Sequence, residues 1–277
     1  MIEIINLTFA YNRQTPLFND LSLNLSPGHC YGLLGKNGAG KTTLLKIIAG
    51  LLFARSGAIT VLNHDPAKRN AAMLSDCFFL SEEFVLPAIS VKQYISLNAP
   101  LYPRFDSVAM NAYCKEFGIV ETMRLDRISF GQKKKFAIAF GLASNCRLMI
   151  MDEPTNGLDI PTKSEFRRIL GAFSSNERCI IISTHQVRDL DSLIDPLIIL
   201  DNGKVLLNES MQSLKSRFAS AITPQPESGI DIVYSEKITG GYGIIKKNDR
   251  SNSNNALDIE LLFNAVTTQP ASFGVVV

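Results

Sequence analysis

The sequence contains no apolar run approaching the roughly 20 residues of a membrane-spanning helix, and no basic stretch leads into an apolar segment near residue 1. C-x-x-C spacing is also absent. The chain has five scattered cysteines, Cys30, Cys77, Cys114, Cys146 and Cys179, and four of them border or lie in apolar runs, where buried thiols behave as small hydrophobes. The net charge is only +2, so composition gives no electrostatic reason to expect a nucleic-acid partner. These absences predict a soluble cytosolic protein with reduced thiols.

A glycine-rich segment lies between the apolar runs 30–34 and 44–48 and fits the pattern G-x-x-x-x-G-K-[ST]. Its residues are Gly35, Lys36, Asn37, Gly38, Ala39, Gly40, Lys41, Thr42 and Thr43. The glycines let successive N–H groups point inward, and the following helix adds its positive end. Lys41, a catalytic candidate, can then reach β- and γ-phosphate oxygens, and the Thr42 hydroxyl can ligate Mg²⁺. A turn that merely joins strand to helix is the alternative, but the full pattern favours a nucleoside triphosphate site.

Two acidic residues follow the apolar run 148–151, as expected where a central parallel strand reaches the C-terminal edge of a sheet. Asp152 is placed to hold Mg²⁺, and Glu153 to accept a proton from the water that attacks the γ-phosphate. His185 follows a second buried run, 179–182, and would face the same ligand. The alternatives are an ordinary acidic strand end and a satisfied surface imidazole.

With 277 residues, the chain has room for one main α/β domain and a small appendage. Residues 2–34 predict short strands, an antiparallel β lead-in, and strands follow at 58–62 and 77–80, the latter buried. From about 84 to 146 the apolar spacing becomes helical, which predicts a helical insertion. A helix is expected over 161–173, and Asp201-Asn202-Gly203 predicts a hairpin turn.

Two features have two interpretations each. Tyr11 could stack on an adenine or be an ordinary half-buried strand tyrosine. The apolar residues after Glu82 could form a docking surface for a partner or could pack under the helical insertion (Phe84, Val85, Leu86, Ile89 and Tyr94).

Residues 216–277 carry no recognisable chemistry. Residues 229–234 and 242–246 predict two strands about Gly240-Gly241. Residues 257–266 are apolar enough to pack on these strands or on another subunit.

Four segments taken together, 35–43, 128–132, 152–159 and 183–185, resemble the ATP-binding subunit of ABC transporters. Ile128-Ser129-Phe130-Gly131-Gln132 is the discriminating one, since it is similar to the family signature L-S-G-G-Q and stands at the family's spacing before Asp152. The stretch 101–106 is similar to single-cassette subunits of the drug- and antibiotic-exporter-like branch.

This resemblance covers roughly residues 1–215 and implies a P-loop NTPase (RecA-like) core with an inserted helical subdomain. Residues 216–277 would form a small C-terminal extension of unknown role. The resemblance implies that Tyr11 stacks on adenine, that His185 is the switch histidine and that Asp159 belongs to the D-loop. It also implies that Ser129, Gly131 and Gln132 bind the nucleotide of a partner chain.

The chain departs from the family pattern at two positions. Phe130 replaces the first glycine of the signature, although Ser129 and the Gly131 N–H are retained. Glu82 stands where the family usually has a glutamine, a potential ligand of the nucleotide and its metal that lacks an amide donor.

The resemblance implies an ATP-hydrolysing subunit, on the inner face of the cell membrane, that forms a dimer with a second copy around two ATP molecules. The dimer would drive a separate membrane permease, in the exporter branch. The alternative is a soluble ABC ATPase acting on nucleic acid or ribosomes, but two cassettes, long coiled coils and cysteine zinc modules are absent. A regulatory binder without turnover would need a damaged catalytic set, yet Lys41, Asp152, Glu153 and His185 are present.

Overall fold

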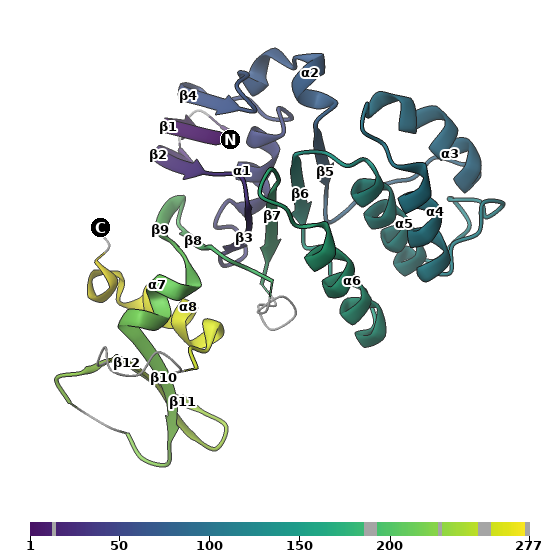
Figure 1. Cartoon of the computed structure of the whole chain (residues 1–277). Coiled ribbons are helices and arrows are strands. Elements are labelled where there is room, and N and C mark those ends of the chain that lie inside the picture. The colour runs from purple at the N-terminus through teal and green to yellow at the C-terminus, as the bar shows by residue number, and fades with distance from the viewer. Residues whose placement is uncertain (13–14, 186–192, 227–228, 249–255, 275–277) are drawn as a thin grey trace.

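The computed structural model spans residues 1–277 and describes all of them except 13–14, 186–192, 227–228, 249–255 and 275–277 (Figure 1). Its centre is a six-stranded sheet in the order β5-β6-β7-β3-β8-β9. The strands are β3 (His29–Leu34), β5 (Cys77–Leu80), β6 (Leu148–Asp152), β7 (Cys179–Thr184), β8 (Leu197–Asp201) and β9 (Lys204–Glu209). All run parallel except β9, which returns through the hairpin predicted at 201–203.

Position in the sheet explains how deeply each strand is buried. β6 and β7 have neighbours on both sides and are buried along their whole length. β5 is an edge strand, and its Phe78 and Phe79 are only half-buried. The expectation of a fully buried strand at 77–80 is therefore wrong for these two side chains, because apolar composition does not distinguish an edge strand from a central one.

The antiparallel lead-in is confirmed as a second sheet in the order β2-β1-β4. It consists of β1 (Ile2–Phe9), β2 (Phe18–Leu25) and β4 (Ser56–Val61). Its buried face, together with helix α1 (Lys41–Ile48), packs against one side of the central sheet in a single apolar cluster. This cluster fixes the start of α1, and hence the glycine-rich segment, at the end of β3.

Three helices lie in the segment predicted to be helical: α3 (Val91–Asn98), α4 (Ser107–Glu116) and α5 (Phe130–Ala143). Ser90 and Ser129 begin α3 and α5 with reciprocal capping boxes, and Asp106 caps α4. The helices lie together at one side of the central sheet (Figure 1). Helix α6 (Ile160–Phe173) connects β6 to β7, and the short α2 (Ala71–Leu74) precedes β5.

Some of the apolar residues after Glu82 pack under the helical insertion, and one stays exposed as a docking surface would require. Leu86 is buried, and Tyr94 packs edge-to-face on Phe136 and Phe140 of α5, so these two belong to the insertion's own core. Phe84 is half-buried against the same core. Val85 is 95% exposed and remains available for a partner.

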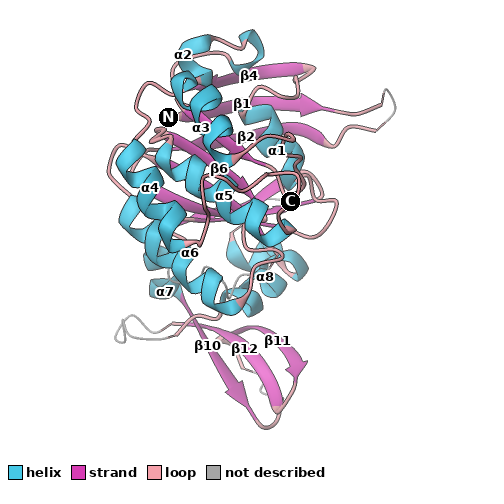
Figure 2. Ribbon diagram, turned by 90° about the vertical axis from the view of Figure 1, so that its right-hand side faces the viewer, coloured by secondary structure: helices cyan, strands magenta, loops and turns pink. Residues whose placement is uncertain are grey.

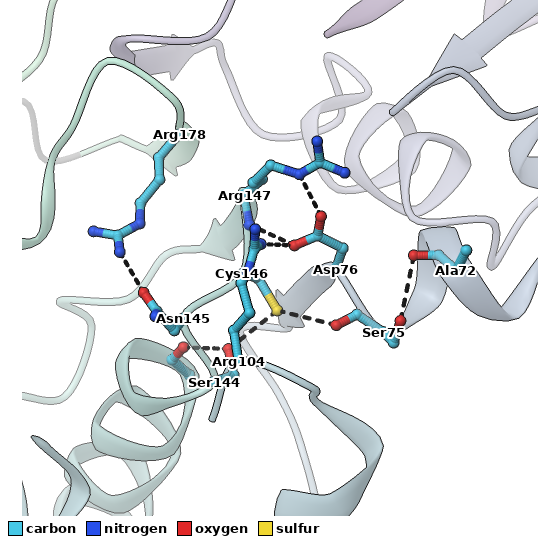
Figure 3. A network of polar contacts seen from close by, with 10 residues as sticks. Ala72, Ser75, Asp76, Arg104, Ser144, Asn145, Cys146, Arg147 and Arg178 are labelled. Carbon is cyan, nitrogen blue, oxygen red and sulfur yellow. Dashed lines mark hydrogen bonds and ion pairs between the residues drawn. The ribbon is translucent and has the colours of Figure 1, made fainter. Parts of the chain in front are cut away.

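A polar network fastens the helical insertion to the amino-terminal edge of the sheet (Figure 3). Asp76, just before β5, accepts hydrogen bonds from the guanidinium groups of Arg104 and Arg147. The Arg147 backbone N–H donates to the same carboxylate at 2.8 Å. Asp76 is mostly shielded, with a side chain only 13% exposed, so one carboxylate joins the insertion, β5 and the start of β6.

The C-terminal part adds a third sheet, in the order β10-β12-β11, and two helices. Its elements are α7 (Met211–Arg217), β10 (Phe218–Thr223), β11 (Ile232–Ile238), β12 (Gly241–Lys247) and α8 (Ile259–Thr268). β11 and β12 form the expected hairpin, but β11 starts at Ile232 rather than at 229. β10 was not predicted. The sheet projects from the rest of the molecule (Figure 2).

Most of the apolar stretch 257–266 lies in helix α8, whose contacts show where this stretch packs. The helix contacts β11 and β12, and also β8 and β9 of the central sheet. Leu262, Ala265 and Val266 are fully buried in a cluster that continues into the core beside the central sheet. None of the helices in the described residues is long and apolar enough to cross a membrane.

Replacing Asp76 tests the network that fastens the insertion. Asp76→Ala leaves two guanidinium groups and a backbone N–H without their acceptor, so we expect the free energy of unfolding to fall by about 1–3 kcal/mol. Urea denaturation measures the change. Asp126→Ala, which removes the exposed partner of Arg124, is the control and is expected to shift the midpoint far less. Equal shifts would contradict the assignment.

Candidate nucleotide-binding site

Strand order brings the predicted site residues to one edge of the sheet. β7 lies between β6 and β3, with Asp152 paired to Ser183 and Leu34 paired to Thr184. The segments that leave these three strands are therefore neighbours at the C-terminal edge. A hollow of about 470 Å³ opens there. Its lining includes Tyr11, Lys36, Asn37, Gly38, Gly40, Lys41, Thr42, Thr43, Glu82, Asp152, Glu153 and His185.

The glycine-rich segment adopts a conformation that requires glycine. Gly38 and Gly40 have φ values of +83° and +107°. A Cβ at Gly40 would lie 2.7 Å from the Phe18 ring. Ala39, whose side chain is buried, and Gly35 belong to the same loop without being among the lining residues. The loop thus leaves its amide groups turned around a space beside the first turn of α1.

Lys41 is held inside this loop. Its Nζ donates to the backbone carbonyls of Gly35 at 2.6 Å and Lys36 at 3.4 Å. Burial lowers the pKa of the Lys41 ammonium, and the nearby Glu153, Asp152 and Glu82 carboxylates oppose that shift. A cation satisfied only by carbonyls in a partly dry site is well placed to exchange them for phosphate oxygens.

Both carboxylate oxygens of Asp152 accept hydrogen bonds from hydroxyl groups. Thr42 Oγ1 donates to Asp152 Oδ2 at 2.7 Å, and Ser183 Oγ donates to Asp152 Oδ1. A hydroxyl and a carboxylate side by side are the oxygen ligands that Mg²⁺ takes while it keeps waters and substrate phosphates. Within the described ranges, no group of three or more His, Cys, Asp or Glu side chains could hold a metal alone. The residues therefore fit a cation that arrives with phosphate.

Glu153 sits in an unusual turn directly after β6. Its φ is +48°, in the left-handed region, and it is only 4% exposed. The Glu153 N–H donates to the Ser183 carbonyl and hydroxyl oxygens at 3.1 and 3.2 Å. His185 Nδ1 lies 2.7 Å from Glu153 Oε1, while Oε2 is buried with no hydrogen-bond partner among the described residues. One carboxylate oxygen is thus oriented, and the other keeps its capacity to accept a proton.

Tyr11 is neither half-buried nor within a strand, since it follows β1 and is 68% exposed. Its hydroxyl shares a 2.8 Å hydrogen bond with Thr43 Oγ1, and its ring meets Phe9 edge-on. The interpretation of Tyr11 as an ordinary strand residue is wrong, because the strand ends at Phe9. Glu82 lies across the hollow and accepts a 2.9 Å hydrogen bond from Asn156 Nδ2.

The signature residues do not line the hollow. Ser129 Oγ accepts from the Gln132 N–H at 3.3 Å and Gln132 Oε1 accepts from the Ser129 N–H at 3.1 Å, so both cap α5. Gly131 is in the first turn of the same helix. Asp159 caps α6 by accepting from the Thr162 N–H, and hydrogen bonds from the Thr162 side chain and backbone lower the pKa of the Asp159 carboxyl group. The chain therefore carries two separate sets of candidate residues.

Three residues of this region were not predicted. Ser183 could have been found from the expected pairing of its strand with β6, which places it opposite Asp152. Lys134 is fully buried and donates a hydrogen bond to the backbone carbonyl of Glu153. Its two neighbours in sequence are also lysines, a pattern that indicates only a surface cluster. Phe263 of α8 lines a hollow of about 230 Å³ with Lys36, Asn37 and His185, and nothing in its sequence context indicates that position.

Comparisons with known proteins agree with this geometry. The sequence profile of the family described as "ABC transporter" matches residues 18–156. The lantibiotic transport ATP-binding protein SrtF of Streptococcus pyogenes is 29% identical, over 76% of this chain and 90% of the relative. The ABC transporter ATP-binding protein NatA of Bacillus subtilis is 32% identical, over 70% and 82%. The bacitracin transport ATP-binding protein BcrA of Bacillus licheniformis is 30% identical, over 78% and 72%.

Solved structures support the fold. The ATP-binding subunit of an ABC transporter superimposes with a TM-score of 0.71 at 24% identity, over 77% of this chain and 91% of that chain. A dimeric cassette in a post-hydrolysis state with ADP and phosphate gives 0.69 at 21% identity, over 77% and 100%. The predicted P-loop fold class and the family resemblance are confirmed. The chain belongs to the ABC transporter family, as an ATP-hydrolysing cassette of that family.

Proposed function

We propose that this protein is the ATPase subunit of an exporter, that two copies enclose two ATP molecules, and that the dimer drives a separate membrane permease. One observation carries the dimer: the signature residues cap α5 and do not line the hollow beside the glycine-rich loop. Neither set completes a site alone, so the loop of one copy would meet Ser129, Gly131, Gln132 and the Asp159 turn of the other. Residues 1–215 would form the cassette, and residues 216–277 an extension built onto it.

Within each site, Glu153 is the proposed base. Its carboxylate takes a proton from water while the water oxygen forms a bond to the γ-phosphorus. The bond from that phosphorus to the β–γ bridging oxygen breaks, and ADP and phosphate are the products. His185 holds Glu153 Oε1, which leaves Oε2 to receive the proton. The positive φ of Glu153 places this carboxylate beside the loop.

The other side chains bind and orient the nucleotide. Lys41 would exchange its two carbonyl acceptors for β- and γ-phosphate oxygens. Tyr11, exposed and tethered through Thr43, would offer a ring face to the adenine. Thr42, Asp152 and Glu82 would hold Mg²⁺, which when bound neutralises the charge that develops on the phosphates.

The names of two relatives support a role in the transport of peptide antibiotics, in keeping with the proposed exporter. SrtF and BcrA are described as transport proteins for a lantibiotic and for bacitracin. Docking on a permease would place the chain on the inner face of the membrane, and exposed Val85 is one residue available for contact. The alternative of a soluble ABC ATPase acting on nucleic acid receives no support from these names, and the net charge of +2 gives it none.

Replacement of Lys41 tests the phosphate site. Lys41→Ala removes a charge that would contact phosphate in the bound state, so we expect ATP affinity to fall roughly 10- to 100-fold. Isothermal titration calorimetry measures the dissociation constant. Lys46→Ala, on the same helix but outside the hollow, is the control. Unchanged affinity in Lys41→Ala would contradict the assignment.

Glu153→Gln tests the base. The amide keeps the shape of the side chain but cannot accept the proton from water, so we expect steady-state turnover to fall roughly 10²- to 10⁴-fold while ATP still binds. A phosphate-release assay gives the rate and a fluorescent nucleotide gives the affinity. Turnover near that of the unaltered protein would move the role of base to another residue.

The dimer is tested in the Glu153→Gln background, where slow hydrolysis preserves the ATP-bound state. Light scattering at saturating ATP is expected to show twice the mass measured without nucleotide. Addition of Ser129→Glu should prevent the increase, because a carboxylate would face the γ-phosphate of the partner's ATP. A monomer at saturating ATP would argue that another cassette or the permease completes the site.

A further inference from the structure

Lys134 lies in the second turn of α5, in the helix that begins at the signature Ser129, and its side chain is fully buried. A buried ammonium needs hydrogen-bond acceptors to offset its lost hydration. Nζ donates to the carbonyl oxygen of Glu153 at 2.7 Å and to that of Asn156 at 2.9 Å. It also lies 5.5 Å from the centre of the Phe130 ring. One side chain thus connects the start of the signature helix to the turn after β6.

The turn that Lys134 holds is the strained one. A non-glycine residue with φ near +48° costs about 1–2 kcal/mol and persists only where its surroundings fix it. The amide of Glu153 is fixed by Ser183, and its carbonyl accepts hydrogen bonds from Lys134 Nζ at 2.7 Å and, more weakly, from the Asn156 N–H at 3.3 Å. With both backbone groups held, the Cα–Cβ bond of Glu153 has a set direction, and Oε1 reaches His185.

Nearby carboxylates offset part of the cost of burying this cation. Burial lowers the pKa of Lys134, and Glu82, Glu153 and Asp152 oppose the shift, so the ammonium faces the carboxylates of the nucleotide site. Ser183, His185 and the Asn156 N–H also form hydrogen bonds with Glu153. Lys134 is therefore a buried cation in direct contact with the backbone of the proposed base, whereas Lys41 contacts the loop.

We propose that Lys134 is a positioning residue, which holds the Glu153 turn in its hydrolytic conformation and links it to the signature end of α5. This inference rests on the proposed role of Glu153 as base. Lys134 contacts neither nucleotide nor water in this role. It acts through the backbone of Glu153 and Asn156. Movement of α5 when a second copy engages Ser129 is thereby passed to the proposed base.

Lys134→Met keeps the length and apolar stem and removes the donor. The reoriented base should lower kcat roughly 10- to 100-fold while KM and ATP affinity change less than about twofold. Lys134→Gln retains one short donor and is expected to lie between Lys134→Met and the unaltered protein. Lys115→Met, at an exposed position on α4, is the control for removal of one positive charge.

A double-mutant cycle separates positioning from a merely structural role. If Lys134 acts through the Glu153 carboxylate, Lys134→Met should lower the residual rate of Glu153→Gln by less than about twofold. A further loss as large as in the unaltered background would overturn the proposal, as would normal kcat in Lys134→Met. Loss of ATP affinity in both Lys134 variants would also overturn it, since the residue would then serve the fold.

Different results would contradict the proposed function and the role of Lys134. Absence of ATP hydrolysis by the unaltered protein, or an active Glu153→Gln, would contradict the role of Glu153 and this inference with it. An active unaltered protein and an inactive Glu153→Gln, together with a fully active Lys134→Met, would contradict the role of Lys134 alone.

Discussion

Parallel pairing of β6 with β7 and of β7 with β3 is the constraint on which the nucleotide site depends. Side chains that are far apart in sequence meet because three neighbouring strands end at one edge. Because Asp152 pairs with Ser183, the Ser183 hydroxyl can donate to one oxygen of the Asp152 carboxylate, and Thr42 donates to the other. A shift of this register by one residue would turn Asp152 to the opposite face and separate it from α1. Burial of β6 and β7 along their whole length makes such a shift costly.

The parts of the site that the sequence predicted are those encoded locally. A glycine-rich loop needs positive φ at set positions, and carboxylates after an apolar strand end at a sheet edge, so Lys41, Asp152 and Glu153 could be placed beforehand. Ser183 depends on strand register and Phe263 on the docking of a distant helix, and neither leaves a local pattern. β10 was missed because its sequence, FASAIT, has small residues and only weak alternation. The assigned roles of the site residues stay predictions.

The site contains two buried lysines that have different hydrogen-bond acceptors and different roles. Lys41 is satisfied by loop carbonyls and Lys134 by carbonyls of the turn after β6, while the charges of Asp152, Glu153 and Glu82 act on both lysines. Neutral acceptors around Lys41 are readily exchanged for phosphate oxygens. Those around Lys134 belong to a turn that must keep its shape throughout the reaction. The first lysine is therefore suited to bind, and the second to hold a conformation.

Phe130, which departs from the family signature, lies beside the same turn that Lys134 contacts. Its ring is half-exposed, lies near Phe84, and occupies the space beside Gly157, where a Cβ would approach it to 3.2 Å. Glycine at 157 is favoured by its φ of +77°, and a Cβ there would also be crowded by the Phe130 ring. The ring and the Lys134 ammonium contact the same turn from successive turns of α5. The phenylalanine leaves the start of α5 intact, because Ser129 still caps the helix and Gly131 lies in its first turn, and its ring adds a contact between α5 and the turn after β6.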